Sequence, residues 1–278
     1  MTAAAVLDPA GLERLSLNQI TLSQWTLPEL IEGCARRGVT TIAPWRERVA
    51  EIGLHRACAL IEAAGLQVSS LCRGGFFCAD SAEDRRRAHE ENRRAVDEAA
   101  ALGAGCLVLV CGPPPGRDLA AARAMIADGI LALVPVAAEA GVRLAIEPLH
   151  PMAIGERSAI VSLEEATELA ARFDPAEVGV IVDVYHVFWD HRLRERIAAA
   201  RGRILGFHVS DWLRQTTDTL QGRGMMGDGI IDLRTIRGWV QEAGYAGPIE
   251  VEVISRALWE RDGDEMLALI CRRFAEHV

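Results

Sequence analysis

Four side chains that commonly bind metal ions each close a short apolar run of the sequence. They are Glu147, Asp183, His208 and Glu252, at the ends of the runs 142–147, 178–183, 204–208 and 249–252. The segments between the runs have helical patterns, so the runs are predicted to be parallel strands of successive strand–helix units. The carboxyl ends of such strands share one rim, where these side chains can meet. Two Glu, one Asp and one His suit one divalent ion, Mn²⁺ first, with Mg²⁺, Co²⁺ and Zn²⁺ as alternatives.

A metal held in this way could support proton transfer at carbon. A divalent ion that binds two adjacent oxygens of a hydroxy-ketone acidifies the carbon-bound proton and stabilises the enediolate. We predict that Glu147 and Glu252 are both ligands and catalytic acid/base groups. The product would be an isomer or an epimer, or water would be eliminated if a leaving hydroxyl is suitably placed. Glu250, on the same face of its strand as Glu252, is expected to be a structural polar group or a partner of the ligands.

Two histidines follow the first two predicted ligands. His150 lies three residues after Glu147, and His186 lies three residues after Asp183. On an extended chain His186 is too close to Asp183 to share its metal comfortably. We therefore predict that both histidines contact the substrate, with a packed histidine at the rim as the alternative for each.

Asp211 and Arg223 extend this polar group. Asp211 follows His208 by three residues and is predicted to bind substrate, with a helix cap or a partner of His208 as alternatives. Arg223 precedes the Gly-rich segment 224–229 and is also predicted to bind substrate. Backbone amides and one guanidinium in this loop suit an anionic or hydroxyl-rich ligand.

Eight strands alternate with eight helices along the chain and position these residues. The predicted strands cover 15–22, 39–43, 66–71, 106–111, 142–147, 178–183, 204–208 and 249–252. The predicted helices cover 26–37, 48–64, 82–102, 119–139, 163–172, 191–200, 233–243 and 265–275. Short links and the number of units predict one domain over residues 1–278, a single (β/α)₈ TIM barrel of the α/β class.

Composition excludes several functions. The net charge of −9 argues against binding of nucleic acid, which depends on phosphate neutralisation. No run approaches the roughly 18 apolar residues of a membrane helix, and no basic residue precedes the first apolar stretch, so we expect a cytoplasmic protein. The seven cysteines form no CxxC pair and are expected to be buried thiols. All thirty basic residues are Arg, which excludes Schiff-base chemistry, pyridoxal phosphate and a P-loop.

The chain resembles the sugar phosphate isomerase/epimerase family, the xylose-isomerase-like barrels. The resemblance spans nearly the whole chain and is strongest from about residue 142, in the segments 146–148, 182–186, 207–211, 223–233 and 244–253. It implies one metal on the four ligands, proton exchange by the two Glu, and substrate contacts from His186 and Arg223. The Arg223 loop looks most like the inosose-isomerase branch. Phe188 stands where ketose epimerases usually have a polar residue, which implies an unusual or larger substrate.

We therefore predict an isomerase or epimerase acting on a keto sugar or keto-cyclitol. A metal-dependent lyase or dehydratase would use the same residues and is the main alternative. An apurinic endonuclease-like phosphodiesterase would need more histidines and a basic surface, and a non-catalytic binding subunit would not need an intact ligand set. The sequence leaves open whether chains pair as homo-oligomers.

Overall fold

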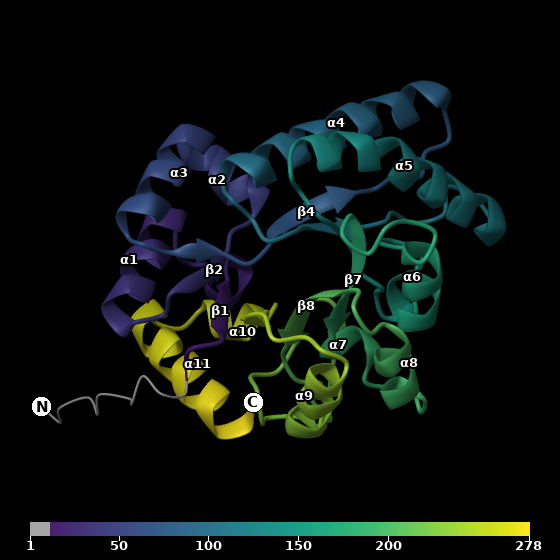
Figure 1. The fold of residues 1–278 in the computed structure, drawn as a ribbon. Helices are drawn as coiled ribbons and strands as arrows, with labels where there is room; N and C mark the ends of the chain where they lie inside the picture. Colours follow the sequence, from purple (N-terminus) through teal and green to yellow (C-terminus); the bar gives the residue numbers. More distant parts are fainter. Residues whose placement is uncertain (1–11) are drawn as a thin grey trace, which may run out of the picture.

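Nine parallel strands form a ring at the centre of the molecule, and helices lie around the outside (Figure 1). The computed structural model describes residues 12–278, so residues 1–11 of the predicted domain lie outside the described part. The strands are β1 (Leu15–Asn18), β2 (Thr41–Ala43), β3 (Gln67–Val68), β4 (Leu71–Gly75), β5 (Leu107–Val110), β6 (Leu144–Ile146), β7 (Val178–Asp183), β8 (Ile204–Val209) and β9 (Ile249–Val251). Their order in the sheet is β3-β2-β1-β9-β8-β7-β6-β5-β4.

The two ends of this order come from one predicted strand. The sequence predicts a single strand over 66–71, but the chain forms β3, which pairs with β2, and then β4, which pairs with β5. A single bridge between Trp45 and Cys72 joins the two sides. The molecule is therefore a nearly closed barrel. The predicted (β/α)₈ fold is confirmed, with one of its eight strands split into two.

The helices return the chain from one strand to the next. They are α1 (Leu27–Arg37), α2 (Arg46–Ile52), α3 (Leu54–Ala63), α4 (Ala82–Ala101), α5 (Leu119–Glu139), α6 (Leu163–Ala170), α8 (Leu193–Ala199), α9 (Leu233–Glu242) and α11 (Gly263–His277). Short elements lie between them: η2 (Gln19–Leu22), η3 (Pro151–Ala153), α7 (Val184–Val187) and α10 (Arg256–Trp259). The helix predicted over 48–64 is two helices, because Gly53 has a φ of 84° and interrupts it.

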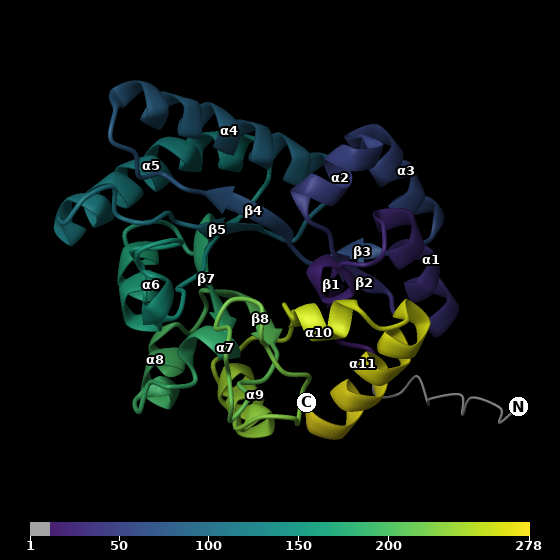
Figure 2. The same cartoon turned by 180° about the vertical axis from the view of Figure 1, so that it is seen from behind.

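Helices α4 and α5 are the longest and lie side by side along one edge of the barrel in both views (Figures 1 and 2). Among the described residues, α5 alone is long and apolar enough to cross a membrane. It contains Arg123 and Asp128, however, and it buries Ile126, Ile130 and Leu133 within the fold. A helix that covers a barrel passes the same test of length and composition, so α5 is only weak evidence of a membrane span.

The strands are buried on both faces. Every residue of β1, β5 and β7 is buried, because helices cover the outside and side chains fill the inside of the barrel. All seven thiols are free, and the predicted burial is confirmed for five of them, whereas Cys58 and Cys78 are partly exposed. This core fixes the direction of each strand and so brings their carboxyl ends to one rim.

Candidate metal centre and active site

The four predicted ligands meet at the carboxyl end of the barrel. Glu147 directly follows β6, Asp183 ends β7, His208 lies near the end of β8, and Glu252 directly follows β9. These strands are neighbours in the sheet, and one ligand atom from each residue lies within 4.8 Å of the others. All four side chains are buried. The structure therefore assembles a group that could hold one divalent ion.

Polar atoms without partners at the centre of this group fit a bound cation. Oε1 of Glu147 and Nδ1 of His208 are buried, have no hydrogen-bond partner among the described residues, and lie 3.5 Å apart. Burial would lower the pKa of His208, but the carboxylates of Glu250, Glu147 and Glu252 outweigh it and raise that pKa well above its ordinary value. The electrostatic field here favours a positive charge, and the ligands suit Mn²⁺ or a similar ion.

Arg223 pairs with two of the four ligands. Its Nη1 donates to Oδ2 of Asp183 at 2.9 Å and to Oε2 of Glu252 at 3.1 Å, and its guanidinium lies over the Tyr185 ring. Burial raises the pKa of Asp183 to about 7, although Arg223 opposes this change. Burial also disfavours the charged form of Glu252, but Arg223 and His208 lower its pKa to about 2. Arg223 also lines the cavity, and its contact with substrate stays a prediction.

His186 lies beside the ligands because a short helix, and not an extended chain, follows Asp183. Helix α7 begins at Val184, and Nε2 of His186 lies 3.6 Å from Oδ2 of Asp183. The main-chain N–H of His150 donates to Nδ1 of His186 at 3.1 Å, and Nη2 of Arg223 lies 3.0 Å from Nε2 of His186. A neutral imidazole can accept from only one of these two groups. The ring nitrogen that carries the proton therefore faces a second donor, with Oδ2 of Asp183 3.6 Å from Nε2, and contact of His186 with substrate stays a prediction.

His150 belongs to an aromatic wall of the site. Its ring stacks on Trp212 with the ring centroids 5.1 Å apart, and Trp189 meets it edge-on at 6.0 Å. Burial lowers the pKa of His150, and its Nδ1 accepts from the main-chain N–H of Met152. Phe188 packs on Trp212 and is not among the residues that line the cavity. It therefore supports the wall from behind.

Asp211 holds the Gly-rich loop and does not line the cavity. Its two carboxylate oxygens accept four main-chain N–H groups, those of Trp212, Gly227, Gly229 and Ile231. Only 1% of the side chain is exposed. Asp211 is thus an anchor of the loop that carries Arg223 and caps no described helix, since the N-cap of α9 is Asp232; its contact with substrate stays a prediction.

Asn18 is a residue of the site that the sequence pattern does not reveal. The predicted strand 15–22 ends at Asn18, so this amide also lies at the rim. Its Nδ2 donates to Oε1 of Glu250 at 2.7 Å and to Oε1 of Glu252 at 3.2 Å. Its Oδ1 accepts from Nε1 of Trp45 at 2.8 Å, and this indole N–H fixes the orientation of the amide. Asn18 closes a strand as the four ligands do, but the apolar residues that follow it conceal the strand end.

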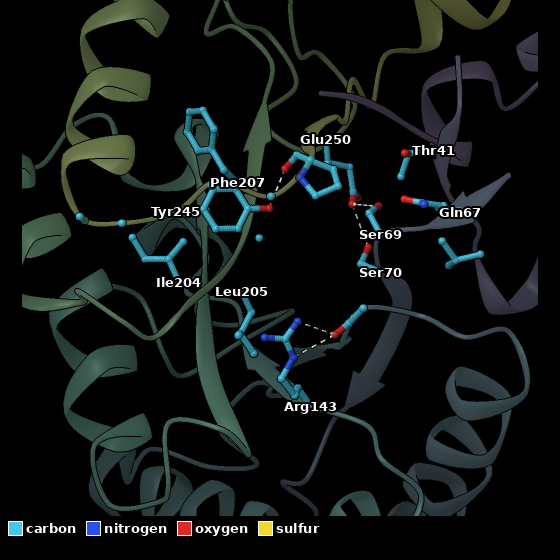
Figure 3. A pocket seen from close by; sticks show the side chains of 18 of the residues that line it. Thr41, Gln67, Ser69, Ser70, Arg143, Ile204, Leu205, Phe207, Tyr245 and Glu250 are labelled. Atoms are coloured by element: carbon cyan, nitrogen blue, oxygen red, sulfur yellow. Dashed lines mark hydrogen bonds between the residues drawn. The ribbon is translucent and has the colours of Figure 1, made fainter. Parts of the chain in front are cut away.

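Glu250 lies one layer below the ligands inside the barrel. The register of β8 and β9 pairs it with His208, and its Oε1 lies 3.6 Å from Nε2 of His208. Its Oε2 accepts from the hydroxyls of Ser69 and Ser70, which lie in the break between β3 and β4 (Figure 3). Glu250 is therefore placed as a partner of His208, and the two serine contacts accompany the interruption of the predicted strand.

Two cavities open at opposite ends of the barrel. The larger, of about 480 Å³, is lined by residues at the amino ends of the strands (Figure 3). Polar groups in it bond to the protein itself: Arg143 donates to the carbonyl of Gly105, and Tyr245 donates to that of Pro248. The smaller cavity, of about 130 Å³, lies at the carboxyl ends, and its lining includes Glu147, His150, Arg157, His186, Arg223 and Glu252. The reactive groups thus face the smaller cavity, at the predicted rim.

A parallel barrel with two Glu, one Asp and one His converging at neighbouring strand ends defines a class of TIM-barrel proteins with a candidate metal site. The chain belongs to the xylose isomerase-like TIM barrel family, whose model matches residues 31–271. This membership confirms the resemblance expected from the sequence.

Comparison with known proteins gives three informative similarities. Protein SMc04130 from Sinorhizobium meliloti 1021 is 47% identical, with a TM-score of 0.94 over 96% of this chain and 98% of that one. The IOLI protein, solved with a binding zinc atom, is 19% identical and shares the fold, with a TM-score of 0.83 over 95% and 98%. The 3-dehydroshikimate dehydratase of Pseudomonas aeruginosa is 27% identical over 256 residues, which are 86% of this chain but only 38% of that enzyme.

Proposed function

We propose that this protein is a divalent-metal-dependent isomerase or epimerase acting on a keto sugar or keto-cyclitol. The observation that carries the proposal is the position of Glu147 and Glu252, which belong to the ligand group and also line the cavity. Asp183 and His208 complete the set that would hold the ion. The zinc atom in the similar IOLI protein supports a metal at such a site, and the oxygen-rich set favours Mn²⁺.

The metal would supply one part of the chemistry. When bound, a divalent ion polarises the carbonyl and the adjacent hydroxyl of a substrate and makes the carbon-bound proton beside them acidic. One of the two carboxylates accepts that proton, while the electron pair of the broken C–H bond moves towards the carbonyl. Return of a proton to the neighbouring carbon gives isomerisation, and return to the opposite face of the same carbon gives epimerisation.

The surrounding residues prepare these carboxylates for proton transfer. Arg223 keeps Glu252 ionised, and the amide of Asn18 holds its Oε1. His186 lines the cavity beside the metal group and would orient the substrate there. The ring of His150, which lines the cavity and is stacked on Trp212, would limit access of water.

A dehydratase is the second candidate function. The similarity to a 3-dehydroshikimate dehydratase favours it, and elimination of water begins with the same removal of a proton beside a carbonyl. Dehydration differs from isomerisation or epimerisation only in the step that follows removal of the proton. Loss of a hydroxyl group from the next carbon would replace the return of a proton.

Incubation in D₂O tests the proposal. Manganese-loaded protein is mixed with a panel of ketoses and inososes, and products are identified by NMR and mass spectrometry, with chelator-treated protein as the control. The expected result is metal-dependent entry of deuterium at carbon with an isomer or epimer as product. A dehydrated product would favour the second candidate, and no deuterium entry with any member of the panel would contradict the proposal.

A further inference from the structure

Two arginines near the carboxyl end of the barrel have no acidic partner. Five arginines among residues 12–278 have a buried Nε without a hydrogen-bond partner: Arg73, Arg123, Arg157, Arg196 and Arg223. Three of these form ion pairs through their terminal nitrogens. Arg123 pairs with Glu165, Arg196 pairs with Glu164, and Arg223 pairs with Asp183 and Glu252. No hydrogen bond or ion pair joins the side chain of Arg73 or Arg157 to any residue in this part of the chain. A buried N–H group without a hydrogen-bond partner is costly, and each of these two side chains has such a group at Nε.

Arg157 lies in the wall of the reactive cavity. It lines that cavity together with Glu147, Glu252 and His186. Its backbone is fixed, because its N–H donates to the carbonyl of Ala153 and its carbonyl accepts from Gly112. The loop therefore anchors the main chain of Arg157 at the edge of the cavity.

Arg73 adds a second positive charge near Arg157. It follows Cys72, which lines the cavity, and its guanidinium lies 4.4 Å from the centroid of the Phe76 ring. Burial lowers the pKa of Arg73, and the nearby charge of Arg157 lowers it further. Two like charges that are partly desolvated and have no ion-pair partner are unfavourable together, and an anion bound by Arg157 in the cavity would relieve that cost.

We propose that Arg157, supported by Arg73, forms an oxyanion-binding subsite, and that the substrate carries a carboxylate or phosphate group. This inference rests on the proposed function, because it places the hydroxy-ketone end of the substrate at the metal group and the anionic end at Arg157. Arg223 does not serve this purpose, since two carboxylates already neutralise its charge. A guanidinium can bind either oxyanion through two parallel hydrogen bonds.

Three matched sugars test the subsite by isothermal titration calorimetry on the manganese-loaded protein. D-fructose, D-fructuronate and D-fructose 6-phosphate share one hydroxy-ketone end and differ at carbon 6, which bears a hydroxyl, a carboxylate or a phosphate. We expect at least one anionic sugar to bind about ten- to a hundredfold more tightly than D-fructose, the range for a charged hydrogen-bonded pair. The sugar that binds more tightly identifies the group. Equal binding of all three, or no detectable binding of any, would overturn the inference.

Variants of Arg157 test whether this residue causes the preference for anionic sugars. Arg157→Gln should bring the affinities for the anionic and neutral sugars together, and Arg157→Lys should keep part of the difference. Arg123→Gln is the matched control, because Arg123 also has a buried Nε but pairs with Glu165 away from this cavity. A preference that persists in Arg157→Gln would overturn the assignment. Since binding is measured without turnover, a preference for anions with no deuterium exchange would refute the proposed function and leave the subsite standing.

Discussion

Replacement of Asn18 by alanine removes the amide that joins Glu250 to Glu252. The amide donates to both carboxylates, at 2.7 and 3.2 Å, and its oxygen accepts from Trp45 and from the main-chain N–H of Ile20. Asn18 is 1% exposed, so water cannot easily replace these bonds. The variant should leave Glu252 less well oriented and should leave the indole N–H of Trp45 without its partner.

The size of the effect follows from these contacts. A buried polar group left without its partner costs about 1–3 kcal/mol, and the groups left by Asn18→Ala together should lower the free energy of unfolding by about 2–4 kcal/mol. Loss of a residue that orients a metal ligand typically reduces activity about 10–100-fold. For Asn18→Ala we therefore expect the rate of deuterium exchange to fall about 10–100-fold, while the metal content is retained under saturating Mn²⁺.

The assay compares exchange rate, metal content and urea unfolding in Asn18→Ala and in Asn92→Ala. Asn92 is a matched control because it is also buried and makes three hydrogen bonds, with Gly75 and Ala88, but lies on α4 and does not line the cavity. The Asn92→Ala variant should be less stable than the wild type, but its folded form should keep the wild-type rate of deuterium exchange. If folded, metal-loaded Asn18→Ala exchanges hydrogen at the wild-type rate, the reasoning about Asn18 is refuted.

Three further variants test the other assignments. Asp183→Ala should bind no metal, and Mn²⁺ at a hundred times the wild-type Kd should no longer add the roughly 2.7 kcal/mol of stability expected for wild type; undiminished metal content would remove Asp183 from the site. His186→Ala should keep its metal and lose about 10²-fold in turnover, whereas metal loss would make His186 a ligand. Asp211→Ala removes the acceptor of four main-chain N–H groups and should lower the free energy of unfolding by about 2–4 kcal/mol, and unchanged urea unfolding would show that these bonds contribute little.

The ligand group could be predicted because it depends only on strand direction. In a parallel barrel every strand ends at the same rim, so a residue that closes a strand has a known location without any knowledge of side-chain contacts. Glu147, Asp183, His208 and Glu252 all lie within one residue of a strand end, and the structure places their ligand atoms within 4.8 Å of one another. The helices and most strands follow from the same alternation of apolar runs and helical patterns.

The remaining contacts depend on the path of loops, which local patterns do not determine. Arg223 reaches Asp183 and Glu252 only because Asp211 gathers the main chain of the Gly-rich loop. Arg157 lies in the middle of a connection and carries no periodic signal. The split between β3 and β4 is accompanied by the contacts of Ser69 and Ser70 with Glu250, about 180 residues later in the chain, which no local pattern reveals.

The central claim is that Glu147 and Glu252 transfer the proton, and their glutamine variants test it most directly. Glutamine keeps the shape and a metal-binding oxygen but removes the basic function, and a positioned base contributes about 10²–10⁴ in rate. The measurement is the rate of deuterium entry into substrate carbon for Glu147→Gln and Glu252→Gln, with metal content determined on the same samples. We predict that exchange collapses in both variants even where manganese is fully retained. Exchange at near wild-type rate in either fully loaded variant would show that this residue is only a ligand and would contradict the two-carboxylate mechanism.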